Sequence, residues 1–175
     1  MGYSCFTLHL LLTLFFFSFR PSSADLIHQT CKTTKYYDLC VATLKSDSSS
    51  PKADDAKALA LIAVRAATAN ATATNAYLSS QMRSAAANDM KAAIKECADK
   101  YAFASEALKS SSQDLSNEMY DYAYMHVMAA ADYPNGCRNA FKRAPGLLYP
   151  PEMALRENGL KRICDVVLGI IDALA

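Results

Sequence analysis

Helical periodicity in a chain that is poor in glycine is the feature that most limits what this sequence can fold into. Beyond residue 24 the glycines are only Gly136, Gly146, Gly159 and Gly169, and alanine, the residue of highest helix propensity, is abundant. Apolar residues recur at steps of three and four, and no segment alternates as a half-buried strand would. The sequence therefore predicts an all-α fold.

The same periodicity divides the chain into four long amphipathic helices. We expect them over residues 51–83, 88–110, 113–143 and 153–174, with Ser50 capping the first and Pro134-Asn135-Gly136 kinking or interrupting the third. Short connections between such helices predict an up-down-up-down four-helix bundle over residues 51–175. Residues 25–50, with a break near Thr33-Thr34, are expected to form an α-hairpin extension at the N-terminus.

The third expected helix has one apolar stripe, which we expect to face the core. Its members step by three or four: Leu115, Met119, Tyr122, His126 and Ala129. On this register Tyr120 and Asp121 point away from the core toward solvent. His126 is then expected to be a core histidine with a hydrogen-bond partner.

The N-terminus has the pattern of a targeting segment. Residues 8–19 are almost wholly apolar, fewer than the ~20 needed to span a bilayer. Small residues at Ser22-Ser23-Ala24 then predict a signal peptide over residues 1–24, the alternative being a membrane anchor. Without Arg20 the remaining lysines and arginines equal the 17 acidic residues, so we expect neither nucleic acid nor a membrane as partner.

Five cysteines follow the signal peptide, namely Cys31, Cys40, Cys97, Cys137 and Cys164. A secreted chain with this many cysteines is expected to form two disulfides and leave one thiol. Counting alone allows any of the five to be the odd one, and we choose Cys164 because it lies in an apolar helical run. Antiparallel neighbouring helices can bring Cys97 beside Cys137, and a Cys31–Cys40 bond would close the hairpin.

Catalytic and cofactor motifs are missing from the sequence. There is no zinc-protease motif, nucleophile elbow or glycine-rich phosphate loop, so we expect no enzyme activity, no metal and no cofactor. The neighbouring carboxylates Asp54 and Asp55 fall at a helix start, where they complement the helix dipole. Asn70-Ala71-Thr72 is a sequon for N-glycosylation at Asn70.

Several segments together resemble a known family. They are the Cys31 to Cys40 spacing, a cysteine on each of the second and third long helices, and residues 30–37, 120–123, 125–127, 132–134 and 162–164. This pattern is similar to that of the plant invertase and pectin methylesterase inhibitor family. Within the family it looks closest to the cell-wall/vacuolar inhibitors of β-fructosidase.

The resemblance implies a secreted inhibitor of a plant acid invertase, acting in the cell wall, the apoplast or the vacuole. It implies four cysteines in disulfides and a free fifth, and stoichiometric binding that plugs the sucrose-binding cleft. Some members present Pro-Lys-Phe at the start of the third bundle helix, where this chain has Met119-Tyr120-Asp121-Tyr122. An aspartate would repel the paired carboxylates of a glycosidase, so Tyr120, Asp121 and Tyr122 are candidate target contacts of a different kind.

Three other functions are compatible with parts of this pattern. Inhibition of pectin methylesterase shares the fold and the cysteine framework. A pro-region of a larger enzyme is disfavoured because the chain stops directly after the fourth expected helix. A helical lipid carrier needs an apolar tunnel, whereas an alanine-rich bundle is expected to pack solid.

Overall fold

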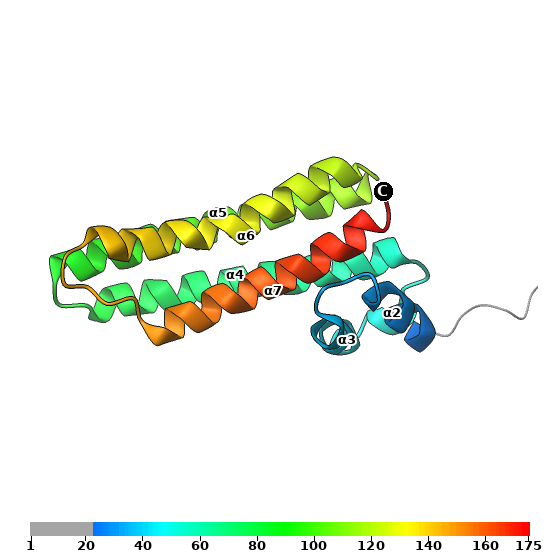
Figure 1. Ribbon diagram of the computed structural model, residues 1–175, viewed down its shortest axis with the longest axis horizontal. Helices are drawn as coiled ribbons and strands as arrows, with labels where there is room; N and C mark the ends of the chain where they lie inside the picture. The colour runs from blue at the N-terminus through cyan, green and yellow to red at the C-terminus, as the bar shows by residue number, and fades with distance from the viewer. Residues whose placement is uncertain (1–22) are drawn as a thin grey trace, which may run out of the picture.

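The computed structural model describes residues 23–175 as an all-α structure (Figure 1). Its order is α2 (Ser23–Cys31), α3 (Tyr37–Lys45), the 3-10 turn η1 (Ser50–Lys52), α4 (Ala56–Ser84), α5 (Asn88–Ser116), α6 (Tyr120–Arg143) and α7 (Pro151–Asp172). The predicted signal peptide lies outside the described residues except for Ser23 and Ala24, which begin α2. The predicted all-helical class is confirmed.

The four long helices form the predicted bundle, in which each helix packs against two others. α5 lies between α4 and α6, and α7 closes the ring against α4 and α6. Their facing sides are fully buried and are largely alanine, leucine and valine, including Leu59, Ala63, Leu108, Val127, Leu160 and Val167. Because small side chains let helices approach closely, the alanines carry much of this packing.

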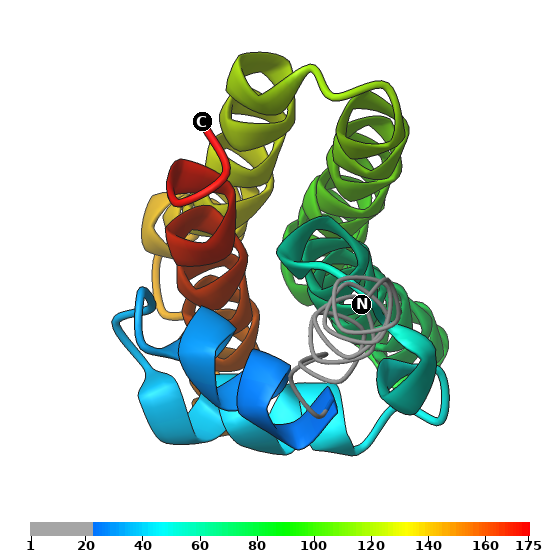
Figure 2. The ribbon, with the colours of Figure 1, turned by 90° about the vertical axis from the view of Figure 1, so that its right-hand side faces the viewer.

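The α2–α3 hairpin lies across the ends of α4 and α7 (Figure 2). At its closest approach the Thr33 hydroxyl donates to the Gly169 carbonyl at 2.9 Å. A Cβ added at Gly169 would stand only 2.9 Å from the Thr34 Cα. Glycine is therefore required on α7 for the hairpin to dock this closely.

Two helix starts and one helix end differ from the prediction by more than two residues. The first long helix begins at Ala56 rather than Pro51, because the Asp55 carboxylate accepts from the Ala58 amide at 2.7 Å as the N-cap. Ser50 does not cap, since it is buried and its hydroxyl donates to the Leu44 carbonyl at 2.6 Å. α5 continues through the serines to Ser116, so the third helix begins at Tyr120.

The predicted inward stripe of the third helix is wrong. Leu115 is buried but belongs to α5, whereas Tyr122 is 60% exposed and Met119 is 40% exposed. The residues of α6 that face the core are Ala123, Val127, Ala130, Pro134, Cys137, Ala140 and Phe141. The error has a physical cause, because a turn after Leu115 resets the helical phase. Pro134 lies inside a continuous α6 rather than interrupting it.

His126 is not the core histidine that the sequence suggested. Its side chain is 42% exposed and its Nδ1 lies 2.7 Å from the Asp114 carboxylate. This contact ties α6 to the last turns of α5.

The cysteines are paired as predicted. One disulfide joins Cys31 to Cys40 within the hairpin, and the other joins Cys97 on α5 to Cys137 on α6. Cys164 is the free thiol and is buried on α7.

Candidate functional site

The tight turn between α5 and α6 positions the residues that the sequence marked as target contacts. Glu118 takes a left-handed backbone conformation, with φ of 59°, which is uncommon for a residue other than glycine. Its carboxylate binds Lys57 on α4 at 2.8 Å, and the Met119 amide donates to the Asp114 carbonyl at 2.9 Å. The start of α6 is thus held to both α4 and α5.

A shallow hollow of about 430 Å³ lies between the start of α6 and the end of α7. It is lined by Tyr120, Asp121, Tyr124, Met125, Ile171, Asp172 and Ala175. Figure 1 shows the chain ending beside this point. The hollow has hydroxyl and carboxylate groups but no basic side chain among its lining residues, so it does not supply a cation for an acidic cleft.

The three candidate contacts do not share one environment. Tyr120 is half-buried and packs against the core, Asp121 is exposed, and Tyr122 is exposed. The expected roles of the two tyrosines are therefore reversed: Tyr122 exposes its ring to solvent and Tyr120 packs its ring against the core.

Sequence reasoning missed two methionines beside Tyr122. Met125 is 64% exposed and Met128 is 52% exposed, and both follow Tyr122 at steps of three along the solvent side of α6. We call Tyr122, Met125 and Met128 the α6 outer face. A usable signal was present, since stepping back from Cys137 by helical turns gives Ala130, Val127 and Ala123 as the core side.

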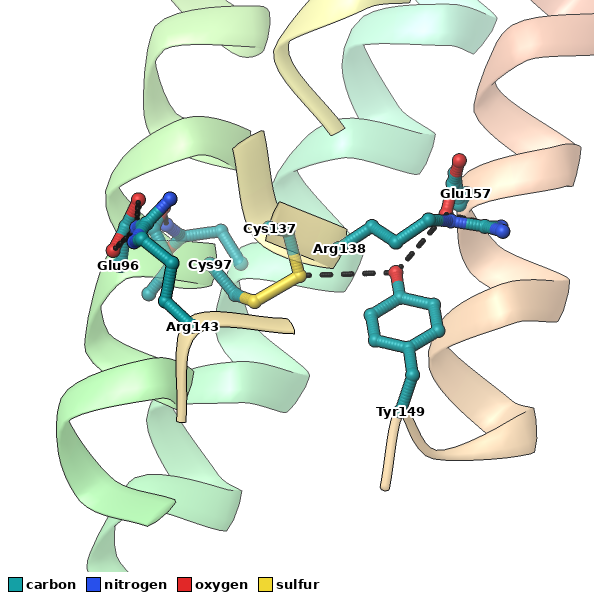
Figure 3. Close-up of a disulfide and its surroundings, with 9 residues drawn as sticks. Glu96, Cys97, Cys137, Arg138, Arg143, Tyr149 and Glu157 are labelled. Atoms are coloured by element: carbon teal, nitrogen blue, oxygen red, sulfur yellow. Dashed lines mark hydrogen bonds and ion pairs between the residues drawn. A yellow bond between two sulfur atoms is a disulfide. The ribbon is translucent and has the colours of Figure 1, made fainter. Parts of the chain in front are cut away.

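The second half of α6, from Cys137 onward, is joined to neighbouring helices by a disulfide and ion pairs (Figure 3). Besides the disulfide at Cys137, the Arg138 guanidinium donates to Glu157 on α7 at 3.0 Å. Arg143 binds both carboxylate oxygens of Glu96 on α5, at 2.7 and 2.6 Å. This half is therefore held to α5 and to α7.

Glu157 is the centre of the α6–α7 contact. It is 4% exposed and also accepts from the Tyr149 hydroxyl at 3.1 Å. Burial, with the negative charge of Glu157 adding to it, raises the pKa of Tyr149 well above its usual range. Tyr149 therefore stays a hydrogen-bond donor and holds the α6–α7 connection against the bundle.

The predicted glycosylation residue lies in a helix seam. Asn70 is half-buried, and its Oδ1 is buried without a hydrogen-bond partner. Its Nδ2, the atom that would carry a glycan, is 3.7 Å from the position of a Cβ at Gly159 on α7. The amide points toward α7, which disfavours N-glycosylation in the folded protein.

Residues 23–175 hold no cluster of three or more histidine, cysteine or acidic side chains that could bind a metal ion. Among their helices, none combines the length and apolar character that crossing a membrane requires.

Comparison with known proteins identifies what the chain is similar to. Residues 25–170 match the family described as plant invertase/pectin methylesterase inhibitor. An Arabidopsis thaliana protein named cell wall / vacuolar inhibitor of fructosidase 2 is 49% identical, with 90% of this chain and 87% of the relative covered. Pectinesterase inhibitor 28 of Oryza sativa subsp. japonica is 40% identical, with 88% of this chain and 71% of the relative covered.

A solved structure has the same fold. It is a mutant form of a pectin methylesterase inhibitor from Arabidopsis, and it superposes with a TM-score of 0.68 at 24% identity, covering 89% of this chain and 99% of that one. At this identity the likeness concerns the fold.

Proposed function

This chain belongs to the plant invertase/pectin methylesterase inhibitor family, and from that premise we propose that it inhibits a plant acid invertase by stoichiometric binding that blocks the sucrose-binding cleft. Family membership makes it an inhibitor rather than an enzyme. The observation that carries the choice of target is the likeness to the Arabidopsis fructosidase inhibitor along almost the whole chain.

The structure supports this mode of action through its rigidity. Two disulfides and the contacts around Glu118 and Glu157 hold the helices before any partner binds. A preordered surface loses little conformational entropy on docking, so more of the contact energy becomes affinity.

Inhibition of pectin methylesterase is the second candidate. It is favoured by the rice relative, which is named as a pectinesterase inhibitor, and it would use the same bundle and disulfides. We rank pectin methylesterase inhibition second because the chain is 49% identical to the fructosidase inhibitor and 40% identical to the rice relative.

We further propose that the protein enters the secretory pathway through a signal peptide at residues 1–24 and acts in the cell wall or the vacuole. The support is the apolar N-terminal run and the name of the Arabidopsis relative. Both disulfides are of the kind that persists in such oxidising compartments.

The test is a titration of two purified enzymes, acid invertase and pectin methylesterase, at mildly acidic pH with the disulfide-bonded protein. We expect invertase activity to fall in proportion to added inhibitor, while the protein alone hydrolyses neither sucrose nor pectin esters. Loss of pectin methylesterase activity alone would select the second candidate. Full activity of both enzymes would reject the proposal.

A further inference from the structure

We propose that the α6 outer face, Tyr122, Met125 and Met128, is the surface that docks on the target enzyme, against an apolar depression with a basic rim. The inference rests on the proposed function, which supplies a protein partner. It adds the place of contact and the chemistry of the surface that fits it.

The first argument is the concentration of exposed apolar side chains on α6. The other large exposed ones in residues 23–175, apart from Met119 next to this face, are Tyr37, Phe103, Leu148 and Leu155, and each stands on a different element. Two of these side chains already have partners. The Phe103 ring packs on Tyr133, with ring centroids 5.8 Å apart, and the Tyr37 hydroxyl lies 2.7 Å from Nδ1 of His28. Within residues 23–175, α6 is the one helix that carries several of these large exposed side chains along one side. Apolar patches of this kind on soluble proteins mark interaction sites.

The residue types fit protein recognition. Tyrosine brings a large rigid area and a polar tip and is enriched among the residues that dominate binding energy. Methionine side chains adapt to an irregular partner surface. The Tyr122 hydroxyl forms no hydrogen bond within the described part of the chain and is free to bind a partner.

The second argument is charge. Between Glu118 and Cys137 the sequence has no lysine or arginine, while Asp121 and Asp132 flank the outer face and are exposed. Such a face would be repelled if it were pushed directly onto the two carboxylates of a glycosidase. It fits instead on the margin of the cleft, where basic residues can meet the aspartates and the bundle covers the entrance.

The same charge disfavours two other occupants. Two copies of this face would bring their aspartates together, and an anionic membrane would find no lysine or arginine between Glu118 and Cys137. Asp121 therefore points to a basic protein surface as the partner.

The experiment compares Met125→Lys and Met128→Lys with Leu155→Lys, which changes an equally exposed apolar residue on α7. We expect each α6 variant to weaken inhibition of acid invertase by about 10-fold or more, and the α7 control to change it by less than about 2-fold. Unchanged thermal melting shows that the variants are folded. Asp121→Lys is expected to weaken inhibition as well. Tighter inhibition would contradict the proposal that basic residues of the target meet Asp121.

The outcomes distinguish a wrong function from a wrong docking surface. If the parent protein leaves invertase fully active, the proposed function fails. If the parent inhibits and both α6 variants inhibit equally well, the docking surface is wrong. Sedimentation should show a monomer, and a dimer that dissociates in Met125→Lys would assign the face to a second copy instead.

Discussion

The two halves of α6 differ in how they are joined to neighbouring helices and in which side chains they expose to solvent. The second half is joined to α5 by the Cys97–Cys137 disulfide and to α7 by the buried Glu157. The first half buries Ala123, Val127 and Ala130 and has Tyr120 partly buried against the core. It leaves Tyr122, Met125 and Met128 in solvent. One helix thus combines a segment that is cross-linked to both neighbours with a segment that exposes large apolar side chains.

This difference separates stability from recognition along a single element. The polar and covalent contacts that join α6 to its neighbours include the disulfide and ion pairs from Cys137 onward, the turn at Glu118 and the His126–Asp114 contact. None of these contacts uses a side chain of the outer face. Changes in the second half should therefore cost folding free energy, and changes on the outer face should cost binding. The following predictions test this division.

The largest effect is expected from removing the bundle disulfide. The Cys97→Ser, Cys137→Ser double variant opens a bond spanning 40 residues, which should lower the free energy of unfolding by about 4 kcal/mol on loop-entropy grounds. Denaturant unfolding measures this. An unfolding midpoint equal to that of the parent would show that the second half of α6 does not depend on the bond.

The next effect is expected at Glu157. Glu157→Gln removes the charge that accepts from Arg138 and Tyr149, and because Arg138 is half-exposed and can regain water, we expect a loss of about 2 to 3 kcal/mol. Arg143→Ala, which breaks the more exposed pair with Glu96, is the control and should cost about 0.5 kcal/mol. If both variants lost the same free energy of unfolding, Glu157 would not be the main stabilising contact between α6 and α7.

The two tyrosines at the start of α6 provide the sharpest contrast. Tyr122→Ala should weaken inhibition by about 2 kcal/mol, roughly 30-fold, with a stability change near 0.5 kcal/mol because the ring is exposed. Tyr120→Ala should instead lower the melting temperature, because this ring packs against the core. An inhibition titration and a thermal melt on each variant check the pair, and the reverse pattern would restore the register expected from sequence.

The smallest effect concerns the free thiol. Burial, together with the nearby Asp165 charge, raises the pKa of Cys164 to about 12, so the thiol stays protonated and cannot attack either disulfide. Iodoacetamide at pH 8 should leave the native protein unmodified and label it once unfolded, as read by mass spectrometry. Rapid labelling of the native protein would contradict the burial.

The sequence predicted the helical class and the bundle because both depend on local periodicity. The cysteine pairs followed from which expected helices lie side by side, and Cys164 was chosen as the free thiol from its apolar surroundings, since cysteine number alone left the choice open. The apolar stripe of α7 was also readable, since Leu160, Val167 and Ile170 are large and regularly spaced. Helix ends were less so: Asp55 rather than Ser50 begins α4, a competition between caps that propensity does not resolve.

The orientation of α6 could not be read from the expected stripe. In the first half of α6 the buried residues are Ala123, Val127 and Ala130, while the larger Tyr122, Met125 and Met128 face solvent. A search for large apolar residues therefore selects the wrong side. Glu118 has a left-handed backbone conformation, and the turn that it forms changes the helical register between Leu115 and Tyr122. A glutamate does not predict such a conformation, so the sequence did not reveal the change of register. A register counted back from Cys137 would have found the core side, because Ala130, Val127 and Ala123 lie at helical spacing from it.

Methionine footprinting of the inhibitor bound to acid invertase is the most direct test of this division. Hydrogen peroxide adds one oxygen atom to an accessible thioether and releases water. Free inhibitor should oxidise fastest at Met125 and Met128, with the half-buried Met82 and Met90 as internal references and the buried Met153 unreactive. In the complex we predict protection of Met125 and Met128 with the references unchanged. Equal oxidation of Met125 and Met128 with and without invertase would contradict the account.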